Sequence, residues 1–97
     1  MKVAIIGHNF MPPGTEEALF RALSPATTAL LCNREAEEVA TRVAHTLRIP
    51  LALADDPAKG ADEVLIFWDG TAGAGSRLAA ACVKSGKPVR LLPIENI

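Results

Sequence analysis

Long hydrophobic stretches are missing from this sequence. The longest uninterrupted apolar runs have four to six residues, whereas a helix needs roughly 20 apolar residues to cross a bilayer. The opening MKVAIIGHN also lacks the longer apolar region and the cleavage site that mark a signal peptide. We therefore expect no membrane contact and a cytoplasmic location.

An excess of charge of either sign is missing as well. The chain has 10 Lys and Arg against 11 Asp and Glu, which gives a net charge of -1. No basic stripe appears along the sequence, and a nucleic-acid-binding surface needs one to neutralise phosphates. Direct binding to nucleic acid is therefore not expected.

Cysteine is scarce. The two thiols, Cys32 and Cys82, lack the CxxC spacing of metal and redox sites. Both lie among apolar residues, which favours buried free thiols over a disulfide or a metal site. No His–acid pair that would activate Cys32 is evident, so it is not expected to be a nucleophile. We expect neither a metal nor a cofactor.

Apolar residues, by contrast, are abundant. They make up 49% of the 97 residues, and this composition and length predict one compact domain over residues 1–97. Five short apolar runs, bounded by turn residues, predict the strands of a parallel sheet. The predicted strands cover residues 2–7, 26–32, 49–54, 62–69 and 87–92.

Proline and helical periodicity predict how these strands are arranged. Pro50 and Pro88 lie at the starts of two predicted strands, and proline donates no ladder hydrogen bond, so these strands suit the edges of the sheet. Helical patterns predict helices over 15–23, 34–47 and 76–84. The alternation predicts an α/β domain of three layers, with helices on both faces of a parallel sheet of order 3-2-1-4-5.

The predicted order reverses between strands 1 and 4. In open α/β sheets, ligands bind outside the carboxyl ends of the strands at such a reversal, because the adjacent loops diverge there. The two bordering loops are GHNFMPPG (7–14) and WDGTAGAGS (68–76). Neither matches the GxGxxG dinucleotide fingerprint or the GxxxxGK[ST] motif of nucleoside triphosphatases.

The second of these loops leads into the only predicted helix without acids in its first turn. Glycines let backbone N–H groups approach an anion, and a helix dipole adds about 0.3–1 kcal/mol. Helices 15–23 and 34–47 begin with glutamates, which repel phosphate. The candidate phosphate-binding residues are Gly70, Thr71, Gly73, Gly75, Ser76 and Arg77. The alternative is a tight turn in which Thr71 or Ser76 caps the helix.

Other candidate ligand contacts lie at the ends of the predicted strands. Asp69 can accept hydrogen bonds from a ribose or a base, or it can cap the glycine turn. Asn33 can contact the ligand or act as the N-cap of helix 34–47. Polar residues after strand 1 can contact a ligand or only begin the next helix. The candidates there are Gly7, His8 and Asn9.

The segment ADEVLIFWDGTAGAGSRLAAACVKSGKPVRLL (61–92), taken with the opening MKVAIIGHN, resembles the SLOG superfamily of Rossmann-like proteins. It is most similar to the small branch called YspA, cpYpsA-related, or DUF2493. The matching positions are Gly7, residues 62–70, Gly75-Ser76 and residues 86–89. The resemblance implies a Rossmann-like domain that binds a nucleotide or nucleotide-derived ligand, with the Gly75-Ser76 turn on a phosphate.

Two departures from the family pattern affect the predicted activity. The Lonely Guy phosphoribohydrolases of this superfamily use a glutamate in the pattern GGxGTxxE, and its position falls on Ala79. Alanine cannot direct water or stabilise an oxocarbenium-like centre. The glycine-rich turn that the small branch carries after strand 2 is replaced by CNREAEE (32–38), where Glu35 adds repulsion. The resemblance therefore implies binding without hydrolysis, as in a sensor or carrier-like module.

Two other hypotheses remain open. One is an enzyme of the nucleotide N-glycosidase or phosphoribohydrolase type, in which His8, Asp69 or Glu37 replaces the missing glutamate. The other is a structural or interaction domain without a ligand. Separately, residues 78–83 are all apolar, which is more than a helix packed on one side of a sheet needs. This surplus predicts a homodimer through helix 76–84.

Overall fold

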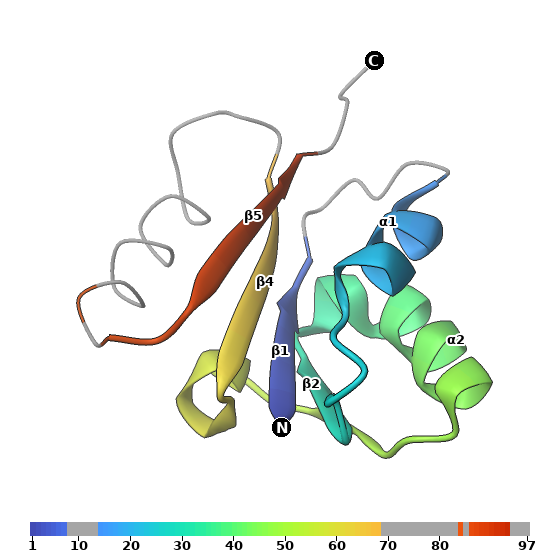
Figure 1. Ribbon diagram of the computed structural model, residues 1–97, viewed down its shortest axis with the longest axis horizontal. Helices are drawn as coiled ribbons and strands as arrows, with labels where there is room; N and C mark the ends of the chain where they lie inside the picture. Colours follow the sequence, from blue (N-terminus) through green and yellow to red (C-terminus); the bar gives the residue numbers. More distant parts are fainter. Residues whose placement is uncertain (8–13, 69–83, 85, 94–97) are drawn as a thin grey trace.

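The computed structural model describes residues 1–7, 14–68, 84 and 86–93. Its core is a five-stranded sheet in which all neighbouring strands are parallel. The order β3-β2-β1-β4-β5 confirms the predicted order (Figure 1). The strands are β1 (Lys2–Ile6), β2 (Ala29–Cys32), β3 (Leu51–Leu53), β4 (Glu63–Trp68) and β5 (Val89–Pro93).

The two prolines precede the two edge strands, as the sequence predicts. Pro50 accepts a hydrogen bond from the Leu30 N–H through its carbonyl, at 2.9 Å. Pro88 accepts one from the Val64 N–H in the same way, at 3.0 Å. A proline has no N–H to donate, so its carbonyl is the only backbone group that can bond a neighbouring strand. Each proline therefore adds one hydrogen bond to the sheet at the start of an edge strand.

Two α-helices lie on the same side of the sheet (Figure 1). The helix α1 (Thr15–Ala22) ends before Ser24 and Pro25, in agreement with the prediction that the residue before proline disfavours a helix. The helix α2 (Glu37–Leu47) is preceded by one 3-10 turn, η1 (Arg34–Ala36), so the predicted helix 34–47 has two parts.

Strand alternation divides the core into two hydrophobic clusters, one on each face of the sheet. The first is packed by α1 and α2 and includes Val3, Ile5, Leu19, Val43, Leu65 and Phe67. The second is smaller and includes Ala4, Ile6, Ala58, Ala61, Val64 and Ile66. Burying one large aliphatic or aromatic side chain contributes roughly 1.5–3 kcal/mol, so these clusters hold the strand order in place.

A short 3-10 helix, η2 (Pro57–Gly60), covers the start of the second face, opposite α1 and α2 (Figure 1). Sequence reasoning treats this stretch as a loop, although Pro57 at the first helical position is a start signal. The ammonium of Lys87 donates hydrogen bonds to the carbonyls of Ala58 and Lys59. A cation at this end of the turn interacts favourably with its last carbonyls, one of which, that of Ala58, also accepts a hydrogen bond from the Ala61 N–H.

Asp62 fastens the start of β4 to the start of β1. Its Oδ2 accepts a hydrogen bond from the Lys2 N–H at 2.8 Å, and its own N–H donates to the Lys2 carbonyl at 2.8 Å. From the edge strand β5, the Arg90 guanidinium donates to the Ala22 carbonyl at the end of α1, at 2.9 Å. Both contacts join segments that are distant in sequence, so they help to fix the positions of the helices and strands.

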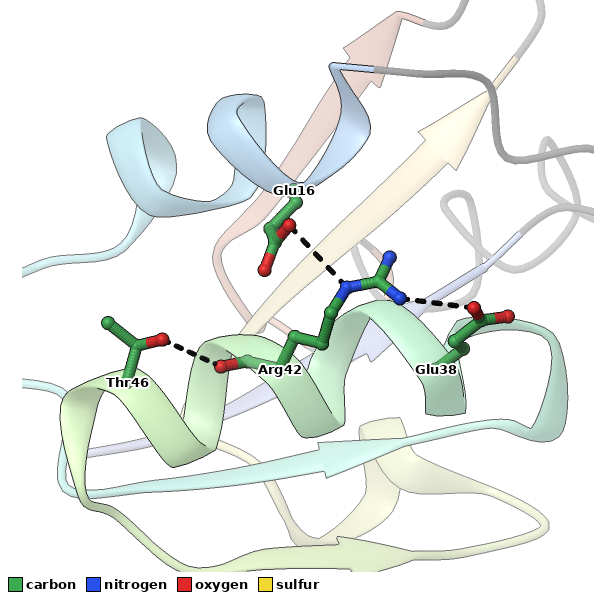
Figure 2. A network of polar contacts seen from close by, with 4 residues as sticks. All are labelled: Glu16, Glu38, Arg42 and Thr46. Atoms are coloured by element: carbon green, nitrogen blue, oxygen red, sulfur yellow. Dashed lines mark hydrogen bonds and ion pairs between the residues drawn. The ribbon is translucent and has the colours of Figure 1, made fainter.

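An exposed polar network joins α1 to α2 (Figure 2). Arg42 lies 3.5 Å from Glu16 of α1 and 3.0 Å from Glu38 one turn earlier in α2, and its carbonyl accepts a hydrogen bond from Thr46. The Arg42 side chain is half exposed, so each ion pair contributes at most about 1 kcal/mol. The apolar core provides most of the free energy that holds the two helices together, and this network adds a small contribution at the surface.

The predicted helix 76–84 lies outside the described residues except for Lys84. Within the described residues, no helix is long and apolar enough to cross a membrane.

The end of α2 is backbone-strained and gives a first testable prediction. Arg48 is the C-cap and has a positive φ of 57°, a conformation that costs a non-glycine residue roughly 1–2 kcal/mol. Arg48→Gly should therefore raise the free energy of unfolding by about 0.5–1 kcal/mol after the entropy of glycine is deducted. Urea unfolding measures this change. Arg48→Ala removes the same charge but keeps the strain, so an equal gain from Arg48→Ala would refute the explanation.

Candidate functional site

The reversal of strand order lies between β1 and β4, as predicted. β1 pairs with β2 on one side and with β4 on the other, and Ile6 is opposite Ile66 near the carboxyl ends. Of the predicted site residues, the structure describes only Gly7 and Asn33. The others lie outside the described residues: His8, Asn9, Asp69, Gly70, Thr71, Gly73, Gly75, Ser76 and Arg77.

Gly7 and Asn33 are in direct contact. The Oδ1 of Asn33 accepts a hydrogen bond from the Gly7 N–H at 2.8 Å, and its Nδ2 donates to the Gly7 carbonyl at 3.4 Å. The Asn33 N–H donates in turn to the Ile5 carbonyl at 3.3 Å. Where β1 and β2 separate, the Asn33 side chain thus takes the place of the backbone hydrogen bonds between the two strands. It holds the end of β1 against the turn after β2.

The same Oδ1 also caps the first turn after β2. It accepts a hydrogen bond from the Ala36 N–H at 3.2 Å, which makes Asn33 the N-cap of η1. Capping is one of the two roles that the sequence leaves open for Asn33. Contact with a ligand, through the second hydrogen of its Nδ2, stays a prediction.

Gly7 is required by close backbone packing. A Cβ at this position would lie 2.5 Å from the Ala36 nitrogen and 2.7 Å from the Glu35 carbonyl carbon. Both are backbone atoms, so no side-chain rotation could relieve the clash. Ala36 is fully buried at this contact. The sequence alone does not reveal that Ala36 packs against Gly7. The one hint is that Ala36, like Gly7, is a small residue shortly after a predicted strand.

The turn after β2 is poorly suited to hold a phosphate. The N–H groups of Gly7 and Ala36 are both bonded to the Asn33 amide. The segment also carries acids in its first turns, Glu35 in η1 and Glu37 in α2. Committed N–H groups and negative charge both disfavour an anion. This observation agrees with the prediction that helix 34–47 repels phosphate.

Cys32 ends β2 one strand away from the reversal. Its side chain is fully buried, and burial raises the pKa of the thiol, with a smaller contribution from the Glu37 carboxylate. A raised pKa keeps the group a neutral thiol near pH 7, and a thiolate is the reactive form. Cys32 therefore belongs to the core, as the sequence predicts for it.

Trp68 is the last residue of β4 and lies in the same alternation as Val64 and Ile66, on the face opposite α1 and α2. It is partly buried. Among the described residues, no group of three His, Cys, Asp or Glu side chains could hold a metal ion.

Comparison of the chain with family models, curated proteins and solved structures finds no match. The resemblance to the SLOG superfamily therefore stays a prediction.

The Gly7 contact gives a second prediction. Gly7→Ala should lower the free energy of unfolding by at least about 2 kcal/mol, because the added methyl group would push η1 away from β1. Chemical denaturation measures the loss. Gly60→Ala is the matched control, since its Cβ would meet only the Leu31 side chain, at 3.3 Å. Equal losses in the two variants would show that the backbone contact is not limiting.

The Cys32 thiol gives a third prediction. Its pKa is higher in the folded than in the unfolded chain, so its contribution to stability is complete below the unfolded pKa of about 8.5 and is lost as pH rises through the folded pKa. In a Cys82→Ala background, stability should fall above that pH by at most about 1.4 kcal/mol per pH unit from this group. Adding Cys32→Ala should flatten the profile, and an unchanged slope would contradict it.

Proposed function

We propose that this chain binds a nucleotide or nucleotide-derived ligand where β1 and β4 end, without catalysing its hydrolysis. The observation that carries the proposal is the reversal of strand order between β1 and β4. In open parallel sheets this reversal opens a crevice at the carboxyl ends of the strands. The chain places its most glycine-rich loop, residues 69–76, directly after one of these strands.

The ligand's anionic group is assigned to the loop after β4. The turn after β2 is closed by Asn33 and carries Glu35 and Glu37. The helix α1 begins with Glu16 and Glu17. Residues 70–77 contain no acid and include Arg77, so they are the entrance best suited to a phosphate. We therefore expect one loop, not two, to hold the anion.

The remaining contacts of the proposal follow the resemblance. Gly7, His8 and Asn9 follow β1 in the sequence and Asp69 follows β4, so we assign them to this crevice, with the Asp69 carboxylate as an acceptor of hydrogen bonds from a ribose or a base. Ala79 stands where the related hydrolases have their glutamate, which favours a sensor or carrier-like module over an enzyme. A cytoplasmic location and a homodimer through helix 76–84 are also part of this proposal.

A thermal-shift panel tests the proposed binding and is the fourth prediction. Nucleoside mono-, di- and triphosphates and cyclic dinucleotides are added separately, and any binder is followed for base release by chromatography. A ligand at 100 times its Kd should stabilise the protein by about 2.7 kcal/mol. We expect at least one nucleotide to raise the Tm, with no release of base.

Arginine variants locate the anion. Arg77→Ala should weaken binding about tenfold or more, because a charge-assisted hydrogen bond contributes about 1.5–3 kcal/mol. Arg21→Ala removes the same charge from the exposed face of α1 and should leave the affinity unchanged. The absence of a shift with every nucleotide would refute the function. Any base release would refute a non-catalytic role, and base release that survives Asp69→Ala would refute the site as well.

A further inference from the structure

The edge strand β3 ends in an exposed leucine. Among the described residues, three large hydrophobic side chains are exposed: Leu47 (42%), Leu53 (50%) and Leu91 (42%). Leu53 ends β3, and Leu47 ends the helix from which the chain turns into β3. Two of the three therefore flank a single edge of the sheet, and β3 itself contains no charged residue that would protect that edge.

The backbone of β3 presents a short, regular row of hydrogen-bonding groups to solvent. The Pro50 carbonyl and the Ala54 N–H are bonded to β2, at 2.9 and 3.0 Å. Because backbone groups alternate in direction along a strand, the N–H and C=O groups of Ala52 point toward β2 as well. The N–H and C=O groups of Leu51 and Leu53 therefore point away from the sheet, and Pro50 removes no donor from this outer row.

We propose that β3 is a self-association site that pairs antiparallel with β3 of a second copy of this chain. A two-fold axis at Ala52 places Leu51 of each copy opposite Leu53 of the other. Each of these pairs can exchange two backbone hydrogen bonds. Leu51 and Leu53 share one face of the sheet, so the exposed Leu53 side chain packs beside Leu51 of the second copy.

Charge complementarity supports this register. Arg48, the C-cap of α2, precedes β3, and Asp56, at the start of η2, follows it. In an antiparallel pair the start of one strand lies beside the end of the other, so the Arg48 side of one copy comes beside the Asp56 side of the second copy. Both residues are exposed, and within the described part of the chain neither has an ion-pair partner. The two-fold arrangement gives each of them a partner of opposite charge, whereas a parallel arrangement of the two strands would bring like charges together.

Leucine variants on the two edges test the site and give the fifth prediction. Wild-type protein at high micromolar concentration should show by sedimentation a mass above the 10.2 kDa of one chain. Leu53→Lys should lower this association, because a charged side chain on an edge strand blocks pairing. Leu91→Lys makes the same change on the opposite edge strand, β5, and should not lower it. Circular dichroism checks that both variants are folded.

A designed cross-link and a charge exchange test the register. In a Cys82→Ala background, Ala52→Cys should form an intermolecular disulfide under mild oxidation, since directly opposed residues of a non-hydrogen-bonded pair have Cα atoms about 4.5 Å apart. The exposed control Ala26→Cys should not. Arg48→Asp and Asp56→Arg should each weaken association, and the double exchange should restore it.

The possible outcomes separate this site from the dimer proposed through helix 76–84. Association that Leu53→Lys leaves intact, or a wild-type protein that remains a monomer, overturns the β3 proposal. Loss of association in Leu53→Lys but not in Leu91→Lys, together with the Ala52→Cys cross-link, supports it. Neither result depends on nucleotide binding, so failure here leaves the proposed nucleotide binding standing, although a monomeric wild type would also refute the dimer through helix 76–84.

Discussion

The contact between Gly7 and the turn after β2 is the constraint on which the centre of this fold depends. β1 has neighbours on both sides, and at its end the chain must leave the sheet while β2 also leaves it. The side chain of Asn33 connects the two separating segments, because it forms hydrogen bonds with the backbone of Gly7 and with the N–H of Ala36. The absence of a Cβ at residue 7 lets the two backbones meet. The position of α2, and hence the packing of one whole face, follows from this contact.

This arrangement changes how the resemblance to SLOG proteins is understood. Several of the matching residues have structural roles that need no ligand. Asp62 joins β4 to β1, Gly86 adopts a positive φ of 83°, and Lys87 binds the carbonyls at the end of η2. Any chain with this fold and these turns would benefit from the same residues. The resemblance at those positions therefore supports a fold, and the proposed function depends on the loop after β4.

Much of the fold could be predicted because the deciding signals are local. Pro50 and Pro88 identify the edge strands, and the apolar repeat within the predicted helix 34–47 identifies α2. The predicted strand 26–32 is too long, since β2 begins at Ala29 and the preceding residues form a turn in which the Thr27 N–H bonds the Ser24 carbonyl. The 3-10 helix η2 is missed although Pro57 is a local start signal, and its contact with Lys87 comes from a residue far along the chain.

The candidate site was harder to predict for the same reason. Gly7 and Asn33 are correctly identified as residues at the carboxyl edge of the sheet, but each has a partner that only the folded chain reveals. Nothing local in the sequence says that Gly7 meets Ala36, or that one amide joins both segments. What sequence alone does indicate is the distribution of charge among the helix entrances, and the acids at the starts of α1 and α2 agree with it.

The central claim is that a nucleotide binds between the ends of β1 and β4 with its phosphate on the loop after β4. An NMR titration tests it most directly, in which isotope-labelled protein is titrated with a nucleotide that raises the Tm. The claim predicts shifts of the Gly7 amide and of the amides of residues 70–77, while the amide of Glu38, in the first turn of α2, stays unchanged. Shifts centred on residues 35–38, with none in 70–77, would contradict it.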